Sequence, residues 1–287
     1  MSFGLALSGG GTKGAAHVGV LLALEEAEMI PTSIAGTSAG ALVAGLYATG
    51  TSPQALKEIV LKMSKHGAFY CDADLTGILM AIPQLVFRHN IEISGLIKGN
   101  RFERFLSKYT NAKNIQDTIL PTIIPAVDLN SGKTIAYTNS LANASPFDGV
   151  EWKTDIQISE AMRASMAVPV VFKPKIIDGM CLVDGGVTDV LPVDLLIAAG
   201  ERNVLAVDLA GEYETPKKHN MIDISTHSLS IMSTRLKDCR SRGEKLLLNP
   251  NLPKESGLLT FEQMEECMAA GYDAVKSNLQ TIKAIFA

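Results

Sequence analysis

The chain has 287 residues, 47% of them hydrophobic and 20% charged, which is enough apolar material for a large buried core. Its formal net charge is −4 and it contains no concentrated run of Lys and Arg, and both features argue against nucleic acid as a partner. The four cysteines, Cys71, Cys181, Cys239 and Cys267, are scattered and form no C-x-x-C pair. We therefore expect free thiols in a reducing compartment and no metal site.

The N-terminus has neither the basic region nor the apolar run of a secretory signal peptide. The most apolar stretch elsewhere, 75–87, is shorter than the roughly 20 residues that span a bilayer. We expect a cytoplasmic protein that can also lie peripherally at a membrane. The sequence is compatible with a homo-oligomer and indicates no cofactor.

The spacing of apolar residues predicts strands and helices that alternate along the chain. The expected strands are 3–7, 31–37, 121–129, 133–138, 180–183, 203–209 and 245–248. The expected helices are 15–28, 39–48, one that begins at Ser52-Pro53, 158–166, 221–240 and 260–285. The turn 130–132 predicts that the strands on either side of it pair. This order indicates a mainly parallel sheet with helices on both faces, in a single domain over 1–287.

Near the C-terminus, Thr260 and Gln263 have the spacing of a capping box before the last expected helix. Apolar residues at helical spacing follow, and we expect them to pack in the core. They are Phe261, Met264, Met268, Tyr272, Val275, Leu279 and Ile282.

The first expected strand runs into a turn with Gly9, Gly11 and Gly14 at the spacing G-x-G-x-x-G. This spacing is the fingerprint of a dinucleotide site, but the same turn could instead aim backbone N–H groups at an oxyanion. A dinucleotide site needs a carboxylate at the end of the second strand, and residues 34–40 contain none. A phosphate-binding loop is excluded because Ala15, rather than Lys, follows Gly14.

The second expected strand ends in Gly36-Thr37-Ser38-Ala39-Gly40, a G-x-S-x-G motif between a strand and a helix. In this context the motif is typical of a nucleophile elbow, a sharp turn that exposes the serine hydroxyl. Gly36 and Gly40 flank the serine because the backbone passes closely there. The following helix directs its positive end toward Ser38, and N–H groups of the turn 9–11 could bind the oxyanion of a tetrahedral intermediate.

A serine nucleophile needs a proton acceptor. His219 lies in a polar loop and His227 within a helical pattern, so we expect surface or capping roles for both. Asp184 ends the strand 180–183 and precedes two glycines, at a strand end where a parallel sheet presents catalytic groups. Because Asp-Gly is also a common turn pair, the residues alone leave Asp184 either a catalytic base or a turn aspartate.

Four segments together resemble the bacterial patatin-like phospholipases, namely 8–14, 36–40, 163–174 and 184–186. The resemblance covers at least residues 3–195 and is weaker in the tail. It implies a patatin-like fold, a three-layer α/β/α sandwich around a mainly parallel sheet. The motif-bearing catalytic core would extend over about 3–195, with C-terminal helices over 215–287 packed on it.

The resemblance also implies a catalytic dyad of Ser38 and Asp184 that needs no metal. The residues that it places at the oxyanion hole are Gly9, Gly10, Gly11 and Thr12. The remaining motif residues, expected next to the substrate, are Lys13, Gly14, Gly36, Gly40, Gly185 and Gly186. Lys13 stands where the family commonly has Arg, and Asp189 and Val190 stand where asparagines are frequent. These departures affect the expected head-group preference more than the chemistry.

We therefore expect a serine lipid acyl hydrolase that cleaves fatty-acyl esters of lipids or phospholipids through an acyl-enzyme. An acyltransferase, or a non-enzymatic lipid-binding protein, would use the same pocket. The apolar stretch 75–87, broken by Pro83, suggests that the region 66–100 caps the acyl site, with an ordinary core helix as the alternative.

Overall fold

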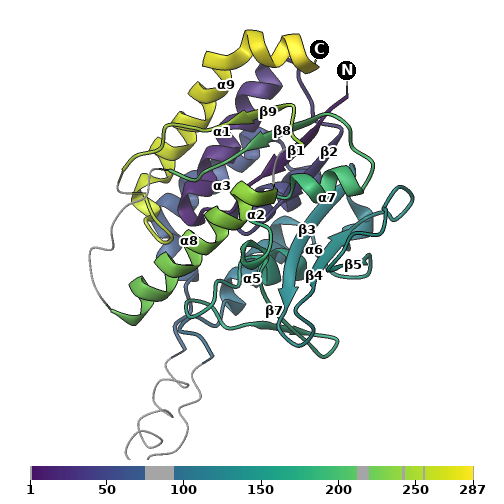
Figure 1. Cartoon of the computed structure of the whole chain (residues 1–287). Helices are drawn as coiled ribbons and strands as arrows, with labels where there is room; N and C mark the ends of the chain where they lie inside the picture. The colour runs from purple at the N-terminus through teal and green to yellow at the C-terminus, as the bar shows by residue number, and fades with distance from the viewer. Residues whose placement is uncertain (1, 75–93, 212–219, 241–242, 255, 287) are drawn as a thin grey trace, which may run out of the picture.

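The computed structural model describes residues 2–74, 94–211, 220–240, 243–254 and 256–286 (Figure 1). A mostly parallel sheet forms its centre, in the order β5-β4-β3-β2-β1-β8-β9, with β7 paired to β3 and β6 paired to β7. The strands are β1 (Gly4–Leu7), β2 (Ser33–Gly36), β3 (Thr122–Asp128), β4 (Thr134–Thr138), β5 (Val150–Lys153), β6 (Lys175–Ile177), β7 (Met180–Asp184), β8 (Val204–Val207) and β9 (Leu246–Leu248).

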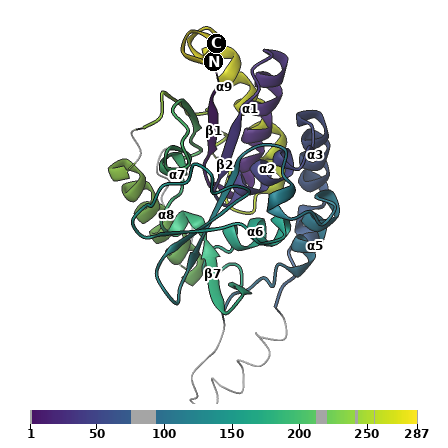
Figure 2. The same cartoon turned by 90° about the vertical axis from the view of Figure 1, so that its right-hand side faces the viewer.

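Helices cover both faces of this sheet, as Figure 2 shows edge-on. One face carries α1 (Ala15–Glu26), α2 (Ala39–Ala48), α3 (Pro53–Tyr70), α5 (Asn100–Tyr109), α6 (Ile158–Ser165) and α9 (Met264–Phe286), which share one apolar core with the sheet. The other face carries α7 (Val193–Ala198) and α8 (Met221–Arg240). The three-layer α/β/α sandwich expected from the sequence is thereby confirmed.

Two strands meet end to end on one edge of β3, and this meeting positions the site. β2 runs parallel to β3, with Ala35 opposite Ile123, whereas β7 runs antiparallel to it, with Asp184 opposite Ala126. Because β4 occupies the other edge of β3 over these residues, β2 and β7 share an edge and their carboxyl ends point toward each other. The residues just after β2 and the last residues of β7 are therefore neighbours in space.

Several expected elements agree with the structure, and the differences have local causes. The pairing of β3 with β4 and the cap of α3 are confirmed, since the Ser52 hydroxyl accepts a hydrogen bond from the Ala55 N–H. The helix expected over 15–28 ends at Glu26, because Glu28 adopts a left-handed backbone (φ 59°). Sequence periodicity missed β5, β6, α5 and α7, which are short or strongly polar.

The capping box expected before the last helix does not form. Thr260 makes no side-chain capping bond, and its N–H, which the Gln263 side chain would accept in a capping box, donates instead to the hydroxyl of the distant Thr12. The apolar stripe of this helix does enter the core. Met268, Val275 and Ile282 are buried there, while Phe261 and Met264 also line the pocket described below.

None of the described helices is both long enough and apolar enough to cross a bilayer. The apolar stretch 75–87 lies outside the described residues. All four cysteines are free; Cys267 is buried, Cys239 is exposed, and Cys71 and Cys181 are half-buried.

Candidate active site

Ser38 stands at the sharp turn between β2 and α2, in a backbone conformation that side chains rarely adopt (φ 53°, ψ −117°). The turn is held by close backbone approaches. A side chain at Gly36 would collide with the backbone of Gly40, and one at Gly40 would collide with the carbonyl of Leu7. The Ser38 N–H donates to the hydroxyl of Ser165 at 3.0 Å, so α6 fixes the elbow from behind. The strand-turn-helix context required of a nucleophile elbow is therefore present.

Asp184 is the last residue of β7, and only 6% of it is exposed. One carboxylate oxygen, Oδ1, accepts a hydrogen bond from the Gly186 N–H at 2.7 Å. The other, Oδ2, is buried without a hydrogen-bond partner among the described residues. Burial raises the pKa of Asp184 to about 6, although the nearby Ser38 hydroxyl and the Gly186 N–H act to lower it. After Asp184 the chain enters a short 3-10 turn, and the Asp184 side chain caps it by accepting the Gly186 N–H.

The glycine turn after β1 packs against Ser38 and holds two amides that have no partner among the described residues. The Gly9 N–H donates to the Val190 carbonyl at 2.9 Å, and the Thr12 N–H donates to Leu258 at 3.2 Å. The N–H groups of Gly10 and Gly11 have no hydrogen-bond partner in the described part of the chain. Gly9 packs against the Ser38 side chain, since a methyl group built on Gly9 would lie 3.3 Å from the Ser38 Cβ. The two free amides are thus available to an anion at this turn.

Gly14 and Gly185 are packing positions around these groups. A side chain at Gly14 would lie 2.5 Å from the Cβ of Ala39, and one at Gly185 would collide with the Pro125 carbonyl. Lys13 does not line the pocket, and its charge acts on Cys267 of α9. Burial raises the pKa of the Cys267 thiol, and Lys13 counteracts that rise.

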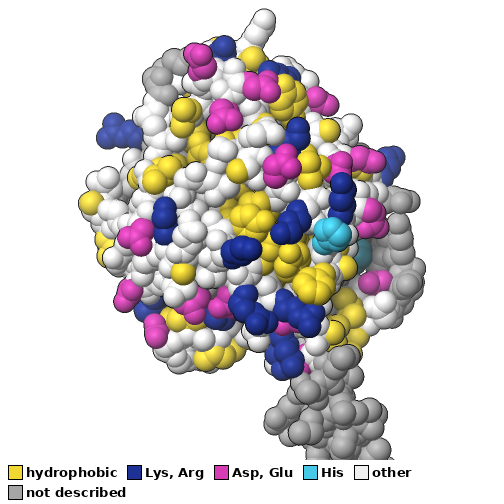
Figure 3. Space-filling model, turned by 180° about the vertical axis from the view of Figure 1, so that it is seen from behind, with side chains coloured by type: hydrophobic (Ala, Val, Ile, Leu, Met, Phe, Trp, Pro, Cys, Tyr) yellow, Lys and Arg dark blue, Asp and Glu magenta, His cyan; other side chains and the backbone are white. Residues whose placement is uncertain are grey.

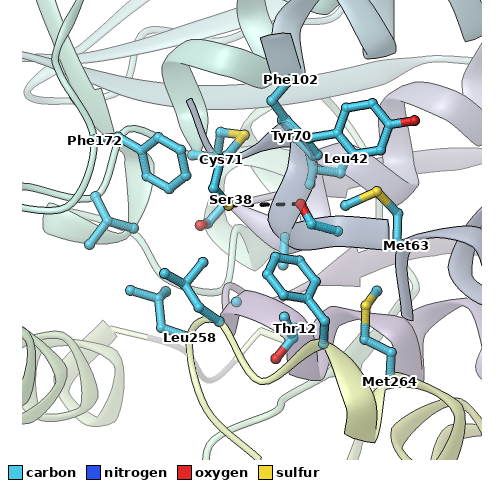
Figure 4. Close-up of a pocket in the computed structure, with 17 residues that line it drawn as sticks. Thr12, Ser38, Leu42, Met63, Tyr70, Cys71, Phe102, Phe172, Leu258 and Met264 are labelled. Carbon is cyan, nitrogen blue, oxygen red and sulfur yellow. Dashed lines mark hydrogen bonds between the residues drawn. The ribbon is translucent and has the colours of Figure 1, made fainter. Parts of the chain in front are cut away.

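An apolar pocket of about 630 Å³, including its open mouth, lies over Ser38 (Figure 4). Its walls come from distant parts of the chain. The residues that line it include Leu42 of α2, Met63 and Tyr70 of α3, Phe102 of α5, Phe172, Leu258, Phe261 and Met264. Such a cavity, with few polar groups in a mostly apolar lining, suits a hydrocarbon chain attached to a reactive carbonyl.

Sequence reasoning missed the Ser165 contact and the part of the pocket that residues 258–264 supply. The Thr12 hydroxyl donates to the Gly257 carbonyl at 2.7 Å and accepts from the Thr260 N–H at 3.2 Å, so the glycine turn anchors this C-terminal segment. No local pattern signals a contact between residues about 245 positions apart. The structure alone supplies it.

No histidine described by the structure reaches Asp184 or Ser38 by a hydrogen bond. His227 bonds through Nδ1 to the carbonyl of Asp223 on its own helix, and His219 lies outside the described residues. His17 is buried beneath the glycine turn, with Nε2 2.8 Å from the Ser8 carbonyl. Burial lowers the pKa of His17 to about 4. Within the described ranges, no group of three or more His, Cys, Asp or Glu side chains could hold a metal ion.

A sequence model of the patatin-like phospholipase family matches residues 5–197. Over 227 residues the chain is 28% identical to patatin-like phospholipase domain-containing protein 6 of Mus musculus. The match covers 79% of this chain and 14% of that protein. It is 29% identical over 215 residues to lysophospholipase NTE1 of Mycosarcoma maydis, covering 75% of this chain and 10% of that protein. Among solved structures, VipD from Legionella pneumophila aligns with a TM-score of 0.54 at 16% identity, over 98% of this chain and 67% of that one. Since the family model spans more than half of the sequence, the chain belongs to the patatin-like phospholipase family.

Proposed function

We propose that this protein is a serine hydrolase of fatty-acyl esters in lipids or phospholipids. Family membership indicates a lipid ester hydrolase. The observation that carries the proposal is that Ser38, in its strained elbow, lines an apolar pocket while its hydroxyl lies close enough to the buried Asp184 carboxylate to lower the pKa of that group. The chain spans only a small part of the length of these relatives, so its substrate class is inferred from this site.

In the proposed reaction, Asp184 takes the proton of the Ser38 hydroxyl while Ser38 Oγ attacks the ester carbonyl carbon. The carbonyl oxygen becomes an oxyanion. Gly10 and Gly11 are its best donors, because their N–H groups have no partner in the described structure, whereas those of Gly9 and Thr12 do. The proton passes from Asp184 to the departing alkoxide, which leaves an acyl group on Ser38. A water molecule then gives a proton to Asp184 while its oxygen bonds to the acyl carbon. The bond from that carbon to Ser38 Oγ breaks, Asp184 returns the proton to Ser38 Oγ, and the fatty acid leaves with both side chains restored.

Covalent labelling tests the nucleophile directly. A fluorophosphonate with a long alkyl chain should form one adduct, located by mass spectrometry at Ser38. Ser38→Ala should lose both labelling and hydrolysis, by on the order of 10⁶ in kcat, as measured for a serine protease. Ser52→Ala, which removes an exposed capping hydroxyl of α3, is the matched control and should keep full activity. An adduct on another residue, or hydrolysis by pure Ser38→Ala, would refute the mechanism.

The choice of base is tested by two variants. Asp184→Asn should retain the fold and lose hydrolysis, whereas His227→Ala should keep most of it. A dead His227→Ala enzyme would require a triad. Product analysis with an added alcohol distinguishes hydrolysis from acyl transfer, because the two routes share the acyl-enzyme and differ in the acceptor. Ester formation in preference to free fatty acid would make the protein an acyltransferase.

A further inference from the structure

The outer sides of α3 and α5 form a basic and aromatic face on a chain whose net charge is −4. We name it the α3/α5 face and define it by the exposed residues within 62–69 and 101–108. Its exposed cations are Lys62, Lys65, Arg101, Arg104 and Lys108. Figure 3 views the molecule from this side and shows Lys and Arg side chains around a hydrophobic patch.

These cations are not neutralised within the described structure. Glu103, the single carboxylate within the two stretches, pairs with Lys175 at 2.8 Å. None of the five cations enters a salt bridge with a described carboxylate. Their positive charge is therefore available to attract an anionic partner that contacts this face.

Aromatic rings lie between the cations. Phe69 is 68% exposed and supports the guanidinium of Arg101, whose Cζ lies 5.3 Å from the ring centroid. The Lys62 ammonium lies 5.9 Å from the rings of Phe105 and Tyr109. A large exposed ring beside long basic side chains suits the boundary of a bilayer, where apolar rings enter the interface and ammonium groups meet phosphates.

The same two helices form a wall of the pocket. Met63 and Tyr70 of α3 and Phe102 of α5 face the cavity over Ser38. Phe69 and Tyr70 contact edge to face, with ring centroids 5.5 Å apart, so aromatic contacts lead from the exposed ring to the pocket lining. A surface that docked here would lie directly outside the acyl site.

We propose that the α3/α5 face docks on the anionic surface of a lipid bilayer and brings its acyl esters to the pocket. The occupant is a lipid surface rather than an acidic protein, because the exposed Phe69 ring lies among the exposed cations and contacts Tyr70, which lines the apolar cavity. The bilayer would supply the substrate of the proposed hydrolase, and to that extent the inference rests on the proposed function. The docking itself does not depend on catalysis.

Sedimentation with vesicles tests the docking, using Ser38→Ala protein so that hydrolysis does not alter the lipids. Vesicles of phosphatidylcholine with phosphatidylglycerol should bind it, and vesicles of phosphatidylcholine alone should bind far less. Each basic residue at an anionic surface contributes about a fivefold gain in partitioning. The quadruple variant Lys62→Gln, Lys65→Gln, Arg101→Gln, Arg104→Gln should therefore bind roughly 600-fold less tightly. Raised salt should weaken the binding of the parent protein.

The matched control removes four exposed cations outside α3 and α5, with the changes Lys133→Gln, Arg202→Gln, Lys245→Gln and Lys283→Gln. It should bind like the parent protein. Equal losses in the two quadruple variants would show general charge attraction and overturn the proposal. Equal binding to both kinds of vesicle, or a dimer in solution that covers the α3/α5 face, would overturn it as well.

Activity measurements separate this inference from the proposed function. With Ser38 present, the α3/α5 variant should hydrolyse a soluble short-chain ester at the parent rate but lose activity on anionic vesicles. Unchanged activity on vesicles would overturn the docking. Vesicle binding without hydrolysis of any ester would overturn the proposed function and leave the docking in place. The soluble-ester rate also verifies that the variant is folded.

Discussion

The Asp184 carboxylate is stabilised poorly by its surroundings. Its pKa of about 6 lies above the ordinary 3.8 because burial disfavours the charged form. The folded protein therefore binds this proton more tightly than the unfolded chain does. The free energy of unfolding accordingly falls as the pH rises from about 4 to about 6, and the whole of this loss is present above that range. A proton acceptor in this state is ionised at neutral pH and yet basic enough to accept a proton from a hydroxyl.

The pH dependence of hydrolysis should reflect this group. We expect kcat/KM on a soluble ester to rise with pH through an apparent pKa near 6 and then to level off. The measurement is a profile of kcat/KM against pH with the Ser38 enzyme under conditions in which it stays folded. A plateau that persists well below pH 5 would show that Asp184 is not the acceptor.

Replacing Asp184 should separate activity from stability. Asp184→Asn removes the buried charge, so above pH 6 its free energy of unfolding should equal or exceed that of the parent by up to about 3 kcal/mol. Asp128→Asn is the control, since Ser131, Asn130 and Cys181 all donate to that carboxylate. Denaturant titration should show Asp128→Asn less stable than the parent. A large loss of stability in Asp184→Asn would mean that this carboxylate is structural.

Ser165 acts on the nucleophile through the backbone. Its hydroxyl accepts the Ser38 N–H, so Ser165→Ala leaves a buried donor without a partner, at a cost of about 1–3 kcal/mol. We expect lower kcat with little change in KM on a soluble ester, because the strained elbow loses a support. Ser159→Ala removes another buried hydroxyl from the same helix, α6, and should leave kcat unchanged. Similar kinetics for the two variants would assign Ser165 to packing alone.

At the scale of elements, the site depends on the shared edge of β3. The sequence predicted the strands that lead to Ser38 and Asp184, since each is a short, largely apolar run next to glycines. It did not predict that β7 runs antiparallel to β3, because pairing between distant segments has no local signature. Sequence reasoning therefore identified the two residues and left the role of Asp184 open. The two residues come together because of the register in which β2 and β7 pair with β3.

A second contact between elements holds the C-terminal side of the pocket. The Thr12 hydroxyl bonds to both Gly257 and Thr260, so Thr12→Val should loosen the segment that carries Leu258 and Phe261. We expect faster hydrogen exchange in residues 256–260 and a higher KM for long-chain esters. Thr118→Val, which breaks hydroxyl bonds to Ile115 and Leu120 away from the pocket, is the control. Unchanged exchange in 256–260 would show that Thr12 does not anchor this segment.

At the scale of the whole molecule, the sandwich was predictable and the pocket was not. Alternating strands and helices with regular apolar spacing indicated the layers. The pocket lining comes from positions between Gly11 and Met264, and no periodicity distinguishes a methionine that faces a cavity from one that packs in the core. The expected cap over 66–100 illustrates this limit. Tyr70 and Cys71 line the pocket, while the apolar stretch itself lies outside the described residues.

Two methionines allow the acyl pocket to be tested against ordinary core packing. Met63 lines the pocket, whereas Met162 is fully buried on α6 against Gly45. Met162→Ala should cost about 2–5 kcal/mol of unfolding free energy and leave substrate preference unchanged, because it opens a closed cavity. Met63→Ala instead enlarges a space that is already open, so it should cost less and raise kcat/KM for longer acyl chains relative to shorter ones. The measurement is kcat/KM across a series of esters of increasing chain length, with denaturant titration of both variants. If both variants lose stability equally and neither changes chain-length preference, the cavity over Ser38 does not hold the acyl chain.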